Sequence, residues 1–138
     1  MEGSTATRVQ ELSREESLRL LQYNSHVGRL AFTAAGRTTI RPVNYVADDD
    51  AIVFCTSPGR TLTELGEDAQ VAFEVDAARP LYHAGWSVIV HGTAREVTDP
   101  SELERLRRGP LRSWAARSTG RWIRISIEEI SGRQIPGS

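Results

Sequence analysis

The stretch RPVNYVADDDAIVFCTSPGRT, residues 41–61, decides the fold of this chain. Runs of β-branched, aromatic and small residues lie on either side of Asp48-Asp49-Asp50, and this pattern predicts a hairpin with strands over 38–46 and 51–56. Ser57-Pro58-Gly59 ends the second strand, because proline and glycine interrupt regular strand pairing. The stretch therefore predicts a β fold with an abrupt turn after its second strand.

Four further strands are predicted outside this hairpin, because apolar and polar residues alternate there as they do in half-buried strands. They cover residues 27–33, 71–76, 86–97 and 121–127. With the two strands of the hairpin, the chain has six.

Short helices are predicted between the strands. Ser13-Arg14-Glu15-Glu16 fits a capping box at the start of a helix that ends near Asn24. Asp99-Pro100 opens a second helix, and a third, short helix carries Leu62 and Leu65 on one face. No strand–long helix–strand rhythm appears, which argues against a doubly wound parallel sheet. The sequence predicts a mainly β fold, a six-stranded antiparallel barrel with short flanking helices.

The length and charge of the chain exclude several classes of protein. Its 138 residues suit one domain, and we expect residues 1–11 to be a flexible N-terminus and residues 12–135 to form the barrel. A net charge of -1 gives no basic field that would attract nucleic acid or a membrane surface. No stretch approaches the ~20 apolar residues that span a bilayer, and residues 1–10 lack the apolar segment of a secretory signal. We expect a cytoplasmic protein without nucleic-acid or membrane partners.

The turn after the hairpin is a candidate phosphate site. Two hydroxyls, those of Thr56 and Ser57, precede Gly59 and Arg60 where a strand turns into a helix. Backbone amides at helix N-termini favour anions, and hydroxyl and guanidinium groups add donors. Serine and threonine are also common as ordinary helix caps, so the local composition allows both readings.

Two other segments are candidate ligand contacts. Pro42 within a strand implies an edge or a bulge, where Arg41 and Asn44 could point donors at a ligand or could simply face solvent. Trp86 and Ser87 open a long strand, where the indole could cover a planar ring or pack in the core or in a dimer interface.

The remaining reactive residue types fit no strong motif. The three histidines match no zinc spacing, so no metal site is predicted, and one histidine such as His83 could at most ligate a haem. The single cysteine, Cys55, lies in an apolar run and is interpreted as a small buried hydrophobe. No Gly-x-Ser-x-Gly elbow, P-loop or Gly-x-Gly-x-x-Gly motif is present, and no catalytic acid or base is named.

Taken in order, these segments resemble the pyridoxamine 5'-phosphate oxidase-like superfamily of flavin-binding split barrels, in its small actinobacterial form. The resemblance covers residues 12–135, and the order and spacing of its motifs carry it. The motifs are Val27-Gly28-Arg29-Leu30-Ala31-Phe32, Arg41-Pro42-Val43-Asn44-Tyr45, Phe54-Cys55-Thr56-Ser57-Pro58-Gly59, Val71-Ala72-Phe73-Glu74-Val75-Asp76, Gly85-Trp86-Ser87-Val88-Ile89-Val90-His91-Gly92-Thr93-Ala94 and Ser131-Gly132-Arg133-Gln134-Ile135.

The resemblance implies a homodimer with FMN, or in some branches the deazaflavin F420, in a groove between the subunits. Its second-strand segment lines the flavin ring, and it corresponds here to Arg41, Pro42, Val43 and Asn44. The ribityl chain and phosphate meet the positions of Thr56, Ser57, Arg60 and Thr61. Trp86 and Ser87 match positions that approach the cofactor from the partner subunit. Many relatives have a lysine where this chain has Thr61.

The function implied is that of a flavoprotein oxidoreductase or reductase acting on a small molecule that the sequence does not identify. The flavin would carry the redox chemistry, and the protein would supply binding and orientation. The alternative is a non-catalytic flavin- or haem-binding sensing module on the same barrel, with His83 or His91 as the haem ligand.

Overall fold

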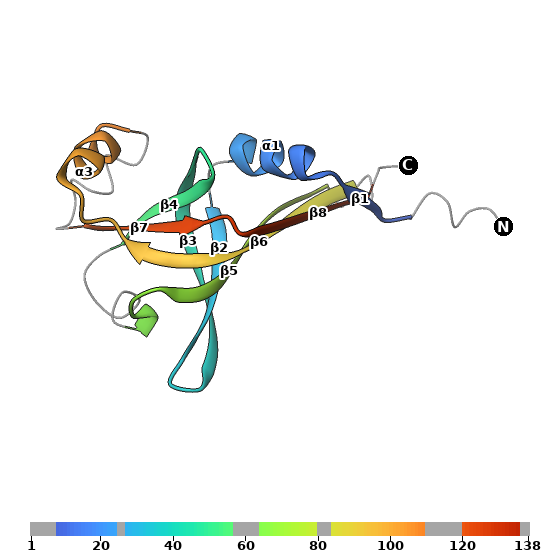
Figure 1. The fold of residues 1–138 in the computed structure, drawn as a ribbon. Helices are drawn as coiled ribbons and strands as arrows, with labels where there is room; N and C mark the ends of the chain where they lie inside the picture. Colours follow the sequence, from blue (N-terminus) through green and yellow to red (C-terminus); the bar gives the residue numbers. More distant parts are fainter. Residues whose placement is uncertain (1–7, 25–26, 57–63, 80–83, 110–119, 136–138) are drawn as a thin grey trace.

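The computed structural model describes residues 8–24, 27–56, 64–79, 84–109 and 120–135, and the account that follows concerns these residues (Figure 1).

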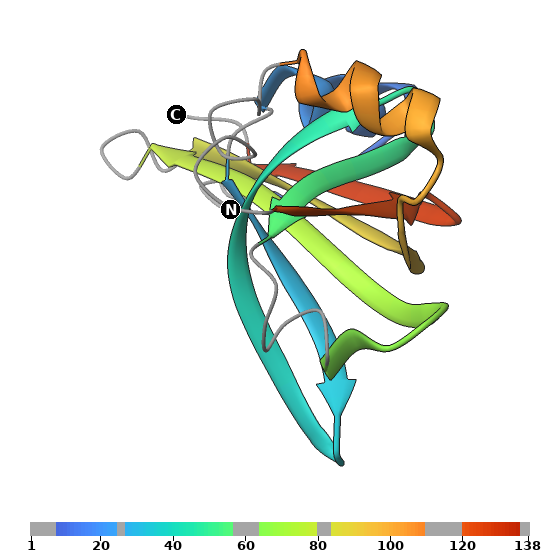
Figure 2. The ribbon, with the colours of Figure 1, turned by 90° about the vertical axis from the view of Figure 1, so that its left-hand side faces the viewer.

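Six antiparallel strands close into a barrel, as the sequence predicts. The strands are β2 (Val27–Ala34), β3 (Arg37–Asp48), β4 (Ala51–Thr56), β5 (Ala69–Arg79), β6 (Ala84–Glu96) and β7 (Arg121–Ser126). Their spatial order is β6-β5-β2-β3-β4-β7, and β7 returns to pair with β6 (Figure 2). Each predicted strand is present, most of them extended by a few residues.

Strand β6 has two partners along one edge, and this divides the barrel wall. Its first part, Gly85 to His91, pairs with β8 (Glu129–Ile135), which pairs in turn with β1 (Gln10–Leu12). Its last part, Ala94 to Glu96, pairs with β7. Neither β1 nor β8 was predicted.

The prediction that residues 1–11 fray is wrong at Gln10 and Glu11, which pair with Gln134 and Arg133. Residues 1–7 lie outside the described part of the chain. Strand β8 was missed because its residues, EISGRQI, are mostly polar and exposed, so they carry no alternating pattern. Strand β8 forms by pairing with the part of the β6 edge that β7 does not cover.

Two helices begin where their caps predict. For α1 (Arg14–Asn24), the amide of Glu16 donates to Ser13 Oγ at 3.1 Å, and the amide of Ser13 donates to Glu16 Oε1 at 2.9 Å. For α3 (Pro100–Arg107), Asp99 Oδ2 accepts from the amide of Glu102 at 3.0 Å. Among the described residues, no helix combines the length and the apolar character needed to cross a bilayer.

The main core fills the barrel, and α1 contributes to it through Leu21. Phe73 and Tyr45 meet edge to face, with ring centroids 5.0 Å apart. The Phe73 ring also lies over Gly28, where an added Cβ would be 2.2 Å from the ring. Glycine is therefore required at this position of β2 for the aromatic pair to fit.

A smaller core lies on the outside of the barrel, under α3. It is formed by Val53, Val97, Leu106 and Trp122. The interpretation of Trp122 as a core residue is confirmed, since it is 1% exposed. Two helices thus cover separate parts of the barrel: α1 contacts β8, β3 and β6, while α3 packs against β4 and β7.

Tyr45→Phe should destabilise the protein. The buried Tyr45 hydroxyl donates to the Leu21 carbonyl oxygen at 2.8 Å and ties β3 to α1. Its loss leaves that carbonyl without this donor, so the free energy of unfolding should fall by about 1 kcal/mol in urea titration. Tyr23→Phe removes the same atom from a side chain that is 86% exposed and should leave the midpoint unchanged. Equal midpoints for both variants would contradict the prediction.

Candidate functional site

One end of the barrel collects the ends of several strands. Thr56 at the end of β4 pairs with Arg121 at the start of β7, and Glu96 at the end of β6 pairs with Ile123. Residues 64–65 are helical, as predicted for the short helix whose Leu62 lies outside the described residues, and the turn at 67–68 leads into β5 at this end. Leu65 is buried in the barrel core. Polar side chains of the turn and strand ends therefore surround an apolar plug.

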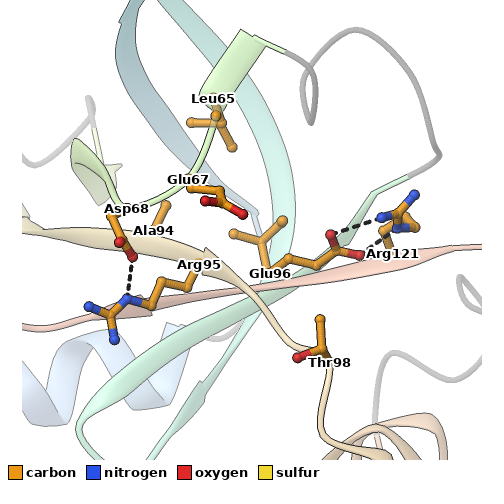
Figure 3. A pocket seen from close by; sticks show the side chains of 10 residues that line it. Leu65, Glu67, Asp68, Ala94, Arg95, Glu96, Thr98 and Arg121 are labelled. Atoms are coloured by element: carbon orange, nitrogen blue, oxygen red, sulfur yellow. Dashed lines mark hydrogen bonds and ion pairs between the residues drawn. The ribbon is translucent and has the colours of Figure 1, made fainter.

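A cavity of about 640 Å³ lies on the β6–β7 side of Leu65 (Figure 3). Leu65, Ala94 and Ile123 form its apolar part. Arg121 Nη2 donates to Glu96 Oε1 at 2.9 Å, and Arg95 Nε donates to Asp68 Oδ1 (Figure 3). Both arginines are paired with carboxylates and Glu67 adds a third acidic group, so the lining of this cavity carries a net negative charge.

A second hollow, of about 450 Å³, lies at the β2–β3 hairpin. It is lined by Ala34, Ala35, Arg37, Thr38, Thr39, Ile40, Arg41 and Glu64. Arg41 Nη2 donates to Glu64 Oε1 at 2.7 Å, and the two side chains are only 32% and 27% exposed. The Nε of Arg41 is buried and has no hydrogen-bond partner among the described residues. Arg41 is thus the predicted ligand contact with spare donor capacity beside a hollow.

The four predicted contacts on β3 divide between its two faces. Arg41 and Val43 lie on the same face of β3 as the buried Tyr45, whereas Pro42 and Asn44 lie on the other face. The two predicted donors, Arg41 and Asn44, therefore point to opposite sides of the strand. Among the described residues, Pro42 lies where β3 pairs with β2 alone, because β4 pairs only with residues 45–48, so of the predicted edge or bulge the structure has an edge.

The predicted phosphate contacts are described only in part. Thr56 ends β4 at the same end of the barrel as Arg41 and Arg121. Ser57, Arg60 and Thr61 lie outside the described residues.

Trp86 and Ser87 belong to the opposite end of β6. They pair with Ala77 and Asp76 on β5. Trp86 and Ser87 precede Glu96 on β6 by ten and nine residues, which corresponds to about 30 Å of extended strand. Trp86 packs partly against the barrel core. Within this chain the two residues therefore lie at the end of β6 that is away from its pairing with β7.

Three charged residues at the strand ends, Glu64, Glu96 and Arg121, were not singled out from the sequence. Glu64 precedes the plug residue Leu65 and reaches Arg41 across 23 positions, while Glu96 and Arg121 are 25 positions apart. Only the pairing of distant strands brings them together. Local spacing carries no signal for such contacts.

The other reactive side chains do not form a centre in the described part of the chain. Cys55 is partly buried beside the small core, and burial raises the pKa of its thiol, which disfavours a thiolate nucleophile. His91 is exposed on the outer face of β6, and His83 is not among the described residues. No group of three or more potential metal ligands occurs in the described ranges.

The outer face of β2 and β5 carries a compact ionic cluster. Arg29 Nη1 lies 2.8 Å from Glu74 Oε1 and 3.3 Å from Asp76 Oδ2. Burial and the neighbouring Asp76 carboxyl raise the pKa of Glu74 to about 7, because Arg29 compensates for only part of both effects. Apolar side chains flank this cluster: Val27 is 47% exposed, and Ile89 is 40% exposed.

Glu74→Gln should change how stability depends on pH. Since the pKa of Glu74 in the folded state, about 7, exceeds its ordinary value of 4.5, the folded state holds this proton more tightly than the unfolded state does. The stability that this adds is complete below the ordinary value and is lost as pH rises through the folded value. The variant should therefore melt higher than the parent at about pH 8 and nearly equal to it at about pH 5. Glu129→Gln, which removes an exposed carboxylate on β8, is the control and should not show this change between the two pH values. A pH profile of melting for Glu74→Gln that matches the parent would contradict the prediction.

Comparison with known proteins identifies related chains. The model of the family described as pyridoxamine 5'-phosphate oxidase matches residues 13–134. The uncharacterized protein Rv0080 of Mycobacterium tuberculosis is 35% identical over 136 residues, which cover 95% of this chain and 88% of that protein.

Two solved structures are similar over nearly the whole barrel. One is the FAD-binding protein from Mycobacterium smegmatis, at 31% identity and a TM-score of 0.74, covering 90% of this chain and 95% of that one. The other is a FAD-binding protein from Mesorhizobium loti, at 25% identity and a TM-score of 0.78, covering 91% of this chain and 97% of that one.

Proposed function

The chain belongs to the pyridoxamine 5'-phosphate oxidase family, and on that premise we propose that it binds a flavin nucleotide at the end of the barrel that holds Arg41 and Thr56. The observation that carries the proposal is the guanidinium of Arg41. It is two-thirds buried beside a hollow of about 450 Å³, and its buried Nε lacks a hydrogen-bond partner among the described residues. A buried unsatisfied donor is costly, and the phosphate or ring oxygens of a flavin would satisfy it.

The proposed flavin is FAD. The two similar structures are both described as FAD-binding, whereas the motif pattern by itself predicts FMN, with F420 as the alternative. All three molecules share a tricyclic ring, a ribityl chain and a phosphate, so the same contacts serve each of them. The mass of the flavin that copurifies separates the three.

Residues of this chain have distinct parts in such a site. Arg41 would donate to the ring or to a phosphate oxygen, and the Thr56 hydroxyl lies at the strand end that leads to Ser57, Arg60 and Thr61. Val43 would contribute apolar surface from the same side of β3 as Arg41. A bound flavin supplies electron transfer, and the protein's part is binding and orientation. We propose an oxidoreductase of a small molecule, and turnover by the flavin-loaded protein separates this activity from a non-catalytic sensing role.

We also propose that two chains form the complete site. Trp86 and Ser87 lie at the far end of β6 from Glu96, and in the proposed dimer they would approach the cofactor of the partner subunit. The exposed Ile40 on β3, Val27 on β2 and Ile89 on β6, with β5 between the last two strands, supply apolar surface for a partner. The Arg29–Glu74–Asp76 cluster offers both signs of charge, as a two-fold interface between identical patches requires.

Arg41→Gln should weaken flavin binding. Losing a charge-assisted hydrogen bond should raise the Kd for FAD about tenfold or more in a fluorescence titration. Arg14→Gln removes the same charge from an exposed position at the start of α1 and should leave the Kd unchanged. A parent protein that is colourless and takes up none of FAD, FMN and F420 would defeat the proposal.

Ile40→Asp should shift the protein from dimer to monomer. Ile40 is 64% exposed on β3, and a carboxylate there would be desolvated at the proposed interface. Light scattering after size exclusion should give twice 15.3 kDa for the parent and 15.3 kDa for the variant at low concentration. Tyr23→Asp, at an exposed position on α1, is the matched control and should remain dimeric. A monomeric parent would rule the interface out.

A further inference from the structure

The ion pair between Arg41 and Glu64 links two parts of the proposed flavin site. Arg41 lies on the stretch of β3 that β4 does not cover, and Glu64 immediately precedes the plug residue Leu65. The Nη2–Oε1 distance is 2.7 Å, and about two-thirds of each side chain is buried. The contact is therefore well formed and partly shielded from water, unlike the more exposed pairs such as Arg95 with Asp68.

The guanidinium of Arg41 is only partly used by this contact. An arginine has five N–H donors arranged as a planar fork. Glu64 accepts from Nη2, whereas the buried Nε has no hydrogen-bond partner among the described residues. The guanidinium therefore keeps at least one N–H, on the buried Nε, that Glu64 does not use.

Carboxylate and phosphate oxygens compete for such a fork, because both use the same N–H donors at nearly the same distance. A phosphate group that engages both the Nε and Nη2 donors would share Nη2 with Glu64, because Glu64 accepts from one of the two N–H groups on that nitrogen. The Glu64 carboxylate also repels a phosphate that approaches Arg41, since like charges within a few ångströms are unfavourable in a partly buried site. A phosphate group at Arg41 should thus bind more weakly while Glu64 holds the same guanidinium.

We propose that Glu64 is an internal competitor that occupies Arg41 in the ligand-free protein and sets how tightly the site holds phosphate-bearing flavins. The proposal rests on the proposed function for the identity of the ligand. Glu64 acts through Arg41, so it is a positioning residue. Its effect should appear for ligands that carry phosphate and be absent for riboflavin, which has the same ring without the phosphate.

The test uses the matched variants Glu64→Gln and Glu67→Gln. Both remove one carboxylate from the segment at residues 64–68 without changing side-chain size, but Glu67 lies on the side of the β6–β7 cavity. Glu64→Gln should lower the Kd for FAD about fivefold, the equivalent of one partly exposed ion pair, and should leave the Kd for riboflavin unchanged. Glu67→Gln should change neither value. In an Arg41→Gln background, Glu64→Gln should lose most of its gain.

Inorganic pyrophosphate provides a second readout that does not depend on flavin. Pyrophosphate should raise the melting temperature of Glu64→Gln by more than it raises that of the parent. Without ligand, the variant should melt no higher than the parent. Pyrophosphate binding that improves in the variant, with no flavin bound by any form, would overturn the proposed function and leave the competitor in place. Flavin binding that is unchanged or weakened by Glu64→Gln would overturn the competitor and leave the proposed function standing.

Discussion

The close approach of β6 to β7 at Gly92 is the constraint on which the barrel depends. An added Cβ at Gly92 would lie 1.7 Å from the Ser126 carbonyl oxygen, so only glycine permits this crossing. Before Gly92 the edge of β6 pairs with β8, and after it with β7. Thr93 Oγ1 donates to Glu128 Oε2 at 2.7 Å and fixes the connection between the two partners. Without this junction β7 could not return to β6, and the sheet would stay open.

Closure determines where the candidate site lies. Because β4 and β6 end where β7 begins, Thr56, Glu96 and Arg121 come to one end of the barrel, and Leu65 closes its interior. The same closure places Trp86 at the far end. The division of predicted contacts between two ends is therefore a consequence of the antiparallel register.

Ion pairs on this barrel contribute differently according to their burial. Exposed pairs such as Arg108 with Glu104 typically add at most about 1 kcal/mol. The pairs of Arg41 and Arg29 are less exposed and lie on surfaces where a ligand or a second chain is proposed. Arg124 joins Asp48 to α3 through Glu102, so that pair serves the attachment of a helix instead. Position in the fold, more than the number of pairs, distinguishes structural from functional charges.

The sequence by itself determined the six barrel strands and the caps of α1 and α3, because alternation and capping act between residues close in the chain. It also limited Pro42 to an edge or a bulge. The order and spacing of its motifs indicated the family. Only the tertiary structure decided that β8 and β1 extend the sheet and that Glu64 meets Arg41. These features depend on which strands pair and in which register. That choice is made by barrel closure across many intervening residues, and no local pattern encodes it.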